Sequence, residues 1–331
     1  MQNKIRVAAC DLFFLPCTMR VPLKFGAETI SSIVNARVCL HLSNEKGEIF
    51  KGWGETPLSV AWAWPSQESF KKREDRMLAF CDALAEAWRK VEYDGHALEC
   101  GWEFLENTMQ PILDEANKNE ELQIPHLAAL ICNSAFDLAL HDAHGKLLKK
   151  PIYETYNKNY LKNDLAFYFN DETFAGKYPE DYLVEESQRY LPVWHLVGGR
   201  DLLTDDERSG EEPDDGYPVT LHEWIKRDGL KCLKVKLTGN DAEWDFQRMK
   251  AVGEIALQYD CSVLSPDLNC MVKEVDYVIN LLKRLQEECP KIYDMILYVE
   301  QPFPYDLEAN PIDVHEITKY KPLFMAESAH D

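Results

Sequence analysis

The chain has 331 residues, 46% of them hydrophobic, and is long enough for two average domains or one large domain with a sizeable core. Its formal net charge of −21 argues against a nucleic-acid partner, because binding phosphates requires clustered lysine and arginine side chains. No apolar run approaches the roughly 18 residues that a membrane-spanning helix needs, so we expect no membrane partner.

The first third of the sequence begins with predicted strands. Residues 1–17 are too short and too interrupted for a secretion signal, and they favour a strand. Residues 32–42 alternate between apolar and polar positions, which is typical of a half-buried strand. The apolar positions are Val34, Ala36, Val38, Leu40 and Leu42. A turn at residues 44–47 leads into a second strand over residues 48–55.

Three helical patterns follow, over residues 67–93, 101–117 and 126–144. The third contains small residues that allow close packing, and Gly145 is its expected C-cap. These small residues are Ala128, Ala129, Ala135, Ala139 and Ala143. We therefore predict an N-terminal α+β domain over residues 1–150. The irregular residues 151–190 indicate a linker or insertion.

From residue 191 onward, short apolar segments alternate with helical patterns at a repeat of about 30 residues. The expected strands are LPVWHLV (191–197), LKCLKVKL (230–237), CSVLSPDL (261–268), MILYVE (295–300) and PLFMA (322–326). The expected helices cover residues 219–229, 241–258, 271–288 and 312–320. This alternation implies parallel strands with crossover helices, in a β/α barrel or an open doubly wound sheet. The acidic residues 204–218 predict a solvated loop that, in a barrel, could help to cover the site.

Charged or polar groups end the expected strands from the second onward. Lys234 and Lys236 are two residues apart and project to the same face, as Asp267 and Asn269 do on the next strand. Glu300 ends the strand after that. Carboxylates from adjacent strand ends suit Mg²⁺, and a lysine beside them can act as a base once its pKa is lowered. This combination suggests removal of a proton α to a carboxylate, with the metal stabilising the enediolate.

At these residues the sequence resembles the enolase superfamily, in its mandelate racemase and muconate-lactonizing branch, where a lysine or histidine base works with Mg²⁺. LKVKLTGND, SPDLN and YVEQPFP are similar to the second, third and fourth barrel strands of that family. VPLKFG, GWGETP and SAFDLALHDAHGKLLKKPIYE resemble parts of its capping domain. The DxN motif at residues 267–269, together with the EQP motif at residues 300–302, is most like the muconate-lactonizing and dipeptide-epimerase subgroup. The resemblance implies an α/β fold, a TIM-type barrel of the modified (β/α)7β kind with an N-terminal α+β capping domain.

The resemblance also implies roles for individual residues. Lys236 would be the acid/base on one face of the substrate, and Lys234 would tune it. Asp267 and Glu300 would be metal ligands, with Asn269 as a contact to the substrate or to these ligands. His195, on the first barrel strand, is expected to be a packed histidine or a substrate contact.

Two departures from the family pattern concern the last expected strand. The family places a third metal ligand where this chain has Ala326, and the adjacent Glu327 could reach the metal only if the strand end is bent. Because the family tolerates Asp or Glu as this ligand, the resemblance makes Glu327 the expected third ligand. A complete barrel takes about 250 residues, so residues 191–331 accommodate about five of its eight strands. We expect a longer natural chain, with a second acid/base beyond residue 331.

The resulting hypothesis is a Mg²⁺-dependent isomerase or lyase acting on a small carboxylate substrate. The reaction would be epimerisation or racemisation, cycloisomerisation or dehydration. The alternative is a non-catalytic homologue that serves as a binding or structural protein, which Ala326 and the missing second base favour. The family pattern also predicts a homo-oligomer. The ten cysteines form no CxxC pair and lie mostly among apolar neighbours, which fits a reducing cytoplasm.

Overall fold

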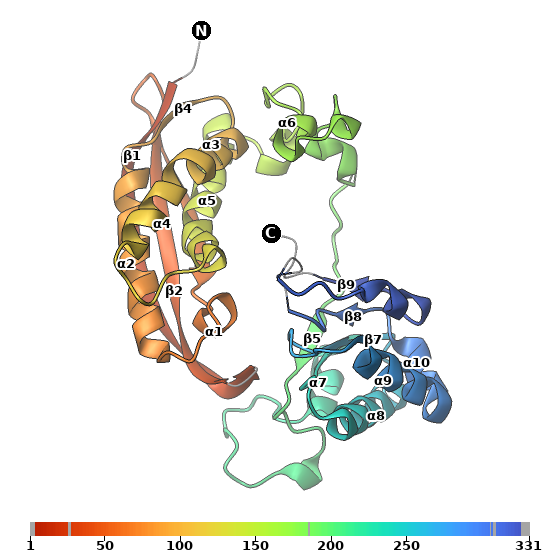
Figure 1. Cartoon of the computed structure of the whole chain (residues 1–331). Coiled ribbons are helices and arrows are strands. Elements are labelled where there is room, and N and C mark those ends of the chain that lie inside the picture. Colours follow the sequence, from red (N-terminus) through yellow and green to blue (C-terminus); the bar gives the residue numbers. More distant parts are fainter. Residues whose placement is uncertain (1–3, 26–27, 185, 305, 307–308, 326–331) are drawn as a thin grey trace. The chain divides into compact units, whose positions relative to one another are not determined.

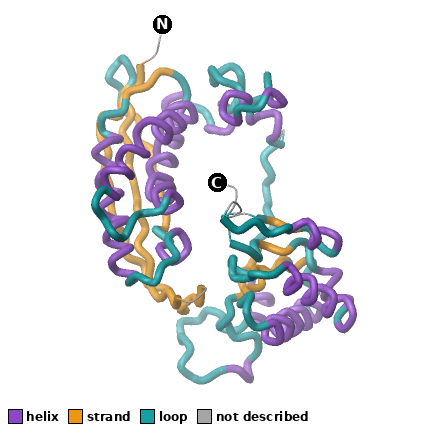
Figure 2. Tube along the Cα trace, in the orientation of Figure 1, coloured by secondary structure: helices purple, strands orange, loops and turns teal. Residues whose placement is uncertain are grey.

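The computed structural model describes residues 4–25, 28–184, 186–304, 306 and 309–325 (Figures 1 and 2). Within it the chain divides into two compact units. The first contains residues 1–19 and 31–187, and the second contains residues 20–30 and 188–331. The second unit thus includes the far ends of the first two strands.

The first unit is built on a four-stranded sheet with the strand order β3-β2-β1-β4. The strands are β1 (Lys4–Phe25), β2 (Glu28–Ser43), β3 (Ile49–Pro57) and β4 (Glu92–Asp94). β3 runs antiparallel to β2, and β4 runs antiparallel to β1. The alternation predicted within residues 32–42 is confirmed, because four of the five apolar positions are buried in the core and Val34 is half-buried.

Helices cover one face of this sheet (Figure 1). They are α1 (Val60–Ala63), α2 (Phe70–Trp88), α3 (Ala97–Phe104), the π-helical turn η1 (Leu105–Met109), α4 (Gln110–Asn117) and α5 (His126–Leu148). α5 packs directly on β3, and α2 packs against α5. Four short helices follow: η2 (Ile152–Thr155), α6 (Leu165–Phe169), η3 (Glu172–Phe174) and η4 (Pro179–Tyr182).

Small residues bring the backbones of β3 and α5 close together. A Cβ atom at Gly52 would overlap backbone atoms of Ala139 and Ala143, and one at Gly54 would overlap the backbone oxygen of Ala135. The alanines predicted to allow close packing are all fully buried. The sequence pattern of α5 was therefore a correct sign of a tight interface, although it did not identify the partner.

Two expectations about helix ends and types were wrong. α5 does not end at Gly145 but at Leu148, and Lys149 takes the left-handed conformation (φ 57°) of the cap. Gly145 is needed for packing instead, since a Cβ atom there would lie 3.0 Å from the carbonyl oxygen of Lys150. The helix expected over residues 312–320 is a 3-10 helix, η6 (Val314–Lys319), which at six residues is long for this tighter form.

The second unit is built on a parallel sheet with the sequential order β5-β6-β7-β8-β9. Its strands are β5 (Trp194–Val197), β6 (Cys232–Lys236), β7 (Val263–Asp267), β8 (Val299–Glu300) and β9 (Leu323–Phe324). The connections contain η5 (Asp205–Glu207), α7 (Leu221–Asp228), α8 (Ala242–Gln258), α9 (Val275–Glu288), α10 (Pro290–Met295) and η6. A doubly wound sheet reverses its strand order at a switch point, so the sequential order favours the barrel over that alternative.

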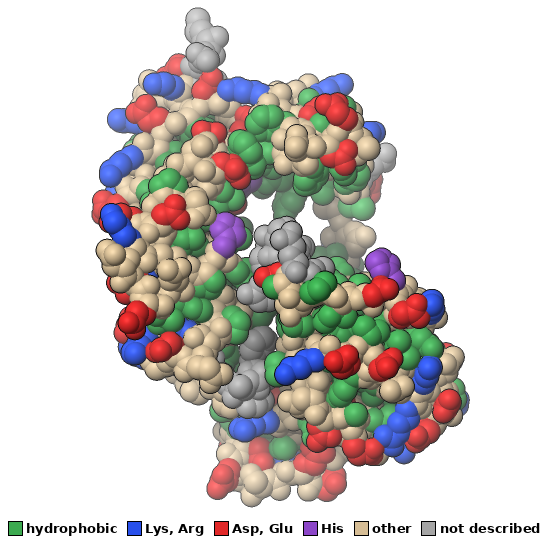
Figure 3. Space-filling view, viewed as in Figure 1, with side chains coloured by type: hydrophobic (Ala, Val, Ile, Leu, Met, Phe, Trp, Pro, Cys, Tyr) green, Lys and Arg blue, Asp and Glu red, His purple; other side chains and the backbone are tan. Residues whose placement is uncertain are grey.

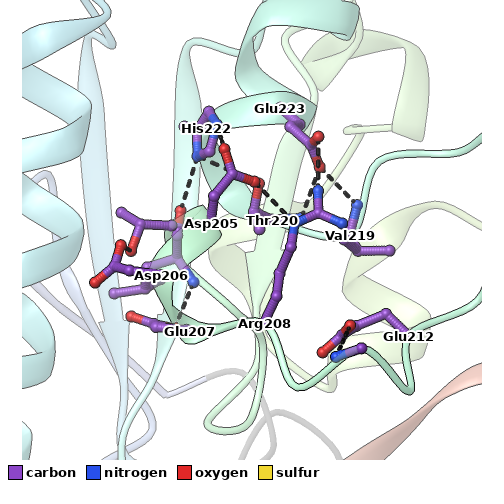
Figure 4. A network of polar contacts seen from close by, with 12 residues as sticks. Asp205, Asp206, Glu207, Arg208, Glu212, Val219, Thr220, His222 and Glu223 are labelled. Atoms are coloured by element: carbon purple, nitrogen blue, oxygen red, sulfur yellow. Dashed lines mark hydrogen bonds and ion pairs between the residues drawn. The ribbon is translucent and has the colours of Figure 1, made fainter.

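The acidic segment of residues 204–218 follows a defined course. Arg208 donates to Asp205 Oδ1 and to Glu223 Oε1 of α7, each at 2.8 Å (Figure 4). Arg20 donates to both carboxylate oxygens of Asp215, at 2.6 and 2.7 Å. The hydrogen bonds from Arg20 lower the pKa of Asp215 to about 2. The segment is thus solvated, as predicted, and also tied down by ion pairs.

A cluster of His96, His141 and His144 lies in the first unit. The rings of His96 and His144 are 4.9 Å apart. His96 Nδ1 accepts the N–H of Leu98 at 3.0 Å and caps α3, which leaves Nε2 to donate to Thr155 Oγ1 at 2.8 Å. Burial, with the neighbouring histidines as a smaller cause, lowers the pKa of His96 to about 3 and that of His144 to about 4. Both rings are therefore neutral in the folded chain at neutral pH.

We expect the first unit to lose stability as the pH falls below 6.5, the ordinary pKa of histidine. Because the folded-state pKa values lie below this value, the unfolded chain takes up protons first. The stabilisation is complete above pH 6.5 and is lost toward pH 4, at about 1.4 kcal/mol per pH unit for each histidine. Denaturant unfolding at neutral and mildly acidic pH measures the slope. His96→Asn keeps a cap acceptor without a titrating ring, and an unchanged slope in this variant would contradict the role of His96.

No helix within the described residues combines the length and the apolar character that crossing a membrane requires. On the face shown in Figure 3, acidic and basic side chains are interspersed with hydrophobic and neutral ones.

Candidate active site

Five of the seven predicted site residues lie at or just beyond the carboxyl ends of β6, β7 and β8: Lys234, Lys236, Asp267, Asn269 and Glu300. Lys236 pairs with Asp267 in the ladder, and Asp267 pairs with Glu300. Paired residues of parallel strands point to the same face, so these three side chains share one face of the sheet, together with Lys234 two residues before Lys236. The residues that alternate with the lysines are buried in the hydrophobic core on the other face: Leu233, Val235 and Leu237.

Lys234 connects the two carboxylates. Its Nζ donates to Glu300 Oε1 at 2.5 Å and lies 3.0 Å from Asp267 Oδ2. Asp267 is 1% exposed and Glu300 is 7% exposed, so their charges need a partner. Burial lowers the pKa of Lys234, but the charges and hydrogen bonds of Asp267 and Glu300 outweigh burial and leave the pKa raised. Lys234 therefore carries a positive charge at neutral pH in this arrangement.

Lys236 and Asn269 complete the cluster. Lys236 Nζ donates to Asp267 Oδ2 and, at 2.8 Å, to Asn269 Oδ1. Asn269 has a positive φ of 53°, which asparagine tolerates better than most residues. In this conformation its N–H donates to Asp267 Oδ1 at 2.9 Å and its side-chain amide donates to the carbonyl of Leu237 at 2.9 Å. Asn269 thus orients both the carboxylate and the lysine.

The donor set fits a hard divalent cation. Asp267 and Glu300 come from neighbouring strand ends, and a lysine ammonium already lies within 3.0 Å of an oxygen of each. A position between two buried carboxylates that accepts an ammonium shows that the site is organised for positive charge. Mg²⁺ takes such carboxylate oxygens and completes its octahedron with water or substrate.

Sequence reasoning missed Asp245, a buried acid in the first turn of α8. Its Oδ1 accepts the N–H of Thr238 at 2.7 Å, and its Oδ2 accepts the N–H of Gly239 at 2.9 Å and the hydroxyl of Tyr277 at 2.7 Å. These bonds hold the loop that follows Lys236. The available signal was an acid four residues after the turn-forming TGND stretch (238–241). This pattern is too common to identify a structural role by itself.

Two predicted site residues are not part of this cluster. His195 pairs with Leu233 in the ladder, so it points to the helix-covered face, where its ring lies 5.7 Å from that of Trp224. Burial lowers its pKa. Of the two expectations for His195, the packed histidine matches this placement and the substrate contact does not. Glu327, the expected third ligand, and Ala326 lie outside the described residues.

The fold of this chain is similar to that of several solved structures. The chain is similar to an enolase from Bradyrhizobium complexed with magnesium and mandelic acid (TM-score 0.56, 16% identity, covering 98% of this chain and 68% of that one). It is also similar to the L-Ala-D/L-Glu epimerase from Bacillus subtilis (TM-score 0.55, 14% identity, covering 96% of this chain and 67% of that one). A third match is a dipeptide epimerase from Methylococcus capsulatus complexed with magnesium and a dipeptide (TM-score 0.52, 19% identity, covering 91% of this chain and 62% of that one). No protein-family model matches the sequence, and no significant match was found among curated proteins.

These matches establish the class of fold. It is an α/β fold like that of these enzymes, with an N-terminal α+β unit and a five-stranded parallel portion of a TIM-type barrel, as predicted. The similar structures include dipeptide epimerases and a mandelate racemase/muconate lactonizing protein from Herpetosiphon aurantiacus. The chain spans between 62% and 68% of the length of the three structures described above.

Proposed function

We propose that this chain carries the catalytic face of a Mg²⁺-dependent acid/base enzyme that removes the α-proton of a small carboxylate substrate. One observation carries the proposal: Lys234, Lys236, Asp267 and Glu300 meet at the ends of three adjacent parallel strands. Active sites of such barrels lie at the carboxyl ends of the strands. The neighbouring structures, complexed with magnesium and with mandelic acid or dipeptides, support the same choice of metal and substrate class.

Each residue has a proposed task. Asp267 and Glu300 hold the cation, and Glu327 is the proposed third ligand. When bound, Mg²⁺ would supply the positive charge that makes extra negative charge on the substrate carboxylate tolerable. Lys236 takes the α-proton at Nζ, which requires that its ammonium first release a proton to solvent and break its hydrogen bond to Asp267. Lys234 keeps its charge and balances the buried carboxylates.

The reaction class is proposed as epimerisation or racemisation. The similar structures include dipeptide epimerases and an N-succinyl Arg/Lys racemase, whose substrates carry a hydrogen α to a carbonyl group. We further propose that residues 1–150 act as the capping domain, 151–190 as a linking segment and 191–331 as the barrel portion. A cytoplasmic location and a homo-oligomer complete the proposal, and the seven buried cysteine thiols suit a reducing compartment.

Exchange of α-protons in D₂O tests this function directly. With Mg²⁺ present, we expect the chain to incorporate deuterium into members of a panel of dipeptides and N-acyl amino acids, as followed by mass spectrometry. Lys236→Ala should slow incorporation by about 10²-fold or more, since general-base catalysis contributes this much. His195→Ala is the matched control, because that ring faces away from the cluster. An absence of exchange on every carboxylate tested would favour the non-catalytic alternative.

A further inference from the structure

We propose that Asp11, Cys39 and His41 form a second metal site, one that takes a thiophilic divalent cation such as Zn²⁺. The three residues lie on two neighbouring strands of the first unit, Asp11 on β1 and the other two on β2. They form the one group of three histidine, cysteine or acidic residues with suitably close donor atoms in the part of the chain that the structure describes.

Strand alternation places all three side chains on the same face of the sheet. Cys39 and His41 are two residues apart on β2, and they alternate with Val38, Leu40 and Leu42, which lie in the core under the helices. On β1, Asp11 follows Cys10, which is also buried in that core. The three donors therefore lie on the face opposite the helices, on two long neighbouring strands.

The spacing of the donor atoms suits a tetrahedral site. In such a site, metal–ligand bonds of about 2.0–2.3 Å place neighbouring donors about 3.3–3.8 Å apart. His41 Nε2 and Asp11 Oδ2 are 3.1 Å apart, and the donor atoms of all three residues lie within 4.8 Å of one another. Small rotations of the side chains would bring them into coordinating positions. Three protein ligands leave the fourth position for water.

The donor types select the metal. Thiolate, imidazole and carboxylate are the ligands of zinc, whereas Mg²⁺ prefers oxygen donors alone. On binding, the S–H bond of Cys39 breaks as the metal–sulfur bond forms, and the proton leaves to solvent. Burial, with the charge of Asp11 as the next cause, raises the pKa of the Cys39 thiol, so the metal-free chain keeps this proton at neutral pH. A cation would neutralise Asp11 and remove that second cause.

Two features of the surroundings bear on affinity. Trp53 pairs with Cys39 across the β2–β3 ladder, and its ring stacks on that of Phe13 at 6.3 Å, so an aromatic pair lies beside the 2% exposed thiol. Lys51 pairs with His41 in the same ladder, and its positively charged ammonium group would repel a cation bound at the site. Replacing Lys51 with Ala should therefore tighten binding, by about threefold.

Titration of the full chain with Co²⁺, in the presence of saturating Mg²⁺, tests the site by absorption spectroscopy. We expect one Co²⁺ per chain, a thiolate-to-cobalt charge-transfer band in the near ultraviolet, and loss of that band when Zn²⁺ is added. Cys39→Ser should abolish the band. His41→Gln and Asp11→Asn should each weaken binding by about 100-fold or more. Asp11 is largely exposed, so its substitution leaves the core intact and keeps the test decisive.

Two controls separate this site from other binding. Cys17→Ser removes an exposed thiol on β1, and Asp267→Asn removes a ligand of the proposed Mg²⁺ site; both should leave the Co²⁺ titration unchanged. The proposal would be overturned if the charge-transfer band persisted in Cys39→Ser. It would also be overturned if the Co²⁺ affinity were unchanged in both His41→Gln and Asp11→Asn. The same holds if the parent chain shows no band at all.

Discussion

Asp267→Asn is expected to abolish Mg²⁺ binding, with a loss in affinity of about 100-fold or more. Asp267 is 1% exposed and shares its carboxylate with Lys234 and Lys236. The neutral amide offers one weaker oxygen donor and leaves two ammonium groups beside it, so both the attraction and the charge balance are lost. Isothermal titration calorimetry of the parent and the variant measures the change. Glu300→Gln should behave in the same way.

The matched control is Glu287→Gln, which changes the net charge equally at an exposed position of α9. Its Mg²⁺ affinity should equal that of the parent chain. If Asp267→Asn and Glu287→Gln bind Mg²⁺ alike, the carboxylates at the strand ends are not the ligands. Circular dichroism of the two variants without metal shows whether the fold is kept, since Asp267 also balances the half-buried lysines Lys234 and Lys236.

Gly52→Ala is expected to destabilise the first unit by about 3 kcal/mol. The added methyl group would overlap backbone atoms of Ala139 and Ala143, and a backbone cannot rotate away as a flexible side chain can. Relief requires that α5 move off β3, which would open the contact that also buries Ala135. Urea unfolding followed by circular dichroism measures the change in the free energy of unfolding.

Lys51→Ala provides the comparison for this prediction. Lys51 precedes Gly52 on the same strand and is exposed, so its replacement should change the free energy of unfolding by no more than about 0.5 kcal/mol. Equal stability of the two variants would show that β3 and α5 can separate without cost, contrary to the packing described above.

The main part of the candidate active-site cluster could be predicted from sequence. Lys234, Lys236, Asp267 and Glu300 end consecutive segments of a strand–helix repeat, and parallel strands bring their carboxyl ends to one edge. Chain order therefore implied proximity before any coordinates were considered. His195 shows where this reasoning stops. Alternation within its segment separates two faces, but only the register with β6 decides which face the histidine takes.

By itself, the sequence determined the kinds of element, their order and the chemistry gathered at the strand ends, because periodicity and residue type are local properties. Tertiary structure alone decided which distant side chains meet. Asp11 lies beside His41, Gly52 against Ala139, and Asp245 beneath the loop after Lys236. Each of these contacts depends on strand register or on how closely two backbones approach, and neither quantity is encoded in the spacing of residues along one segment.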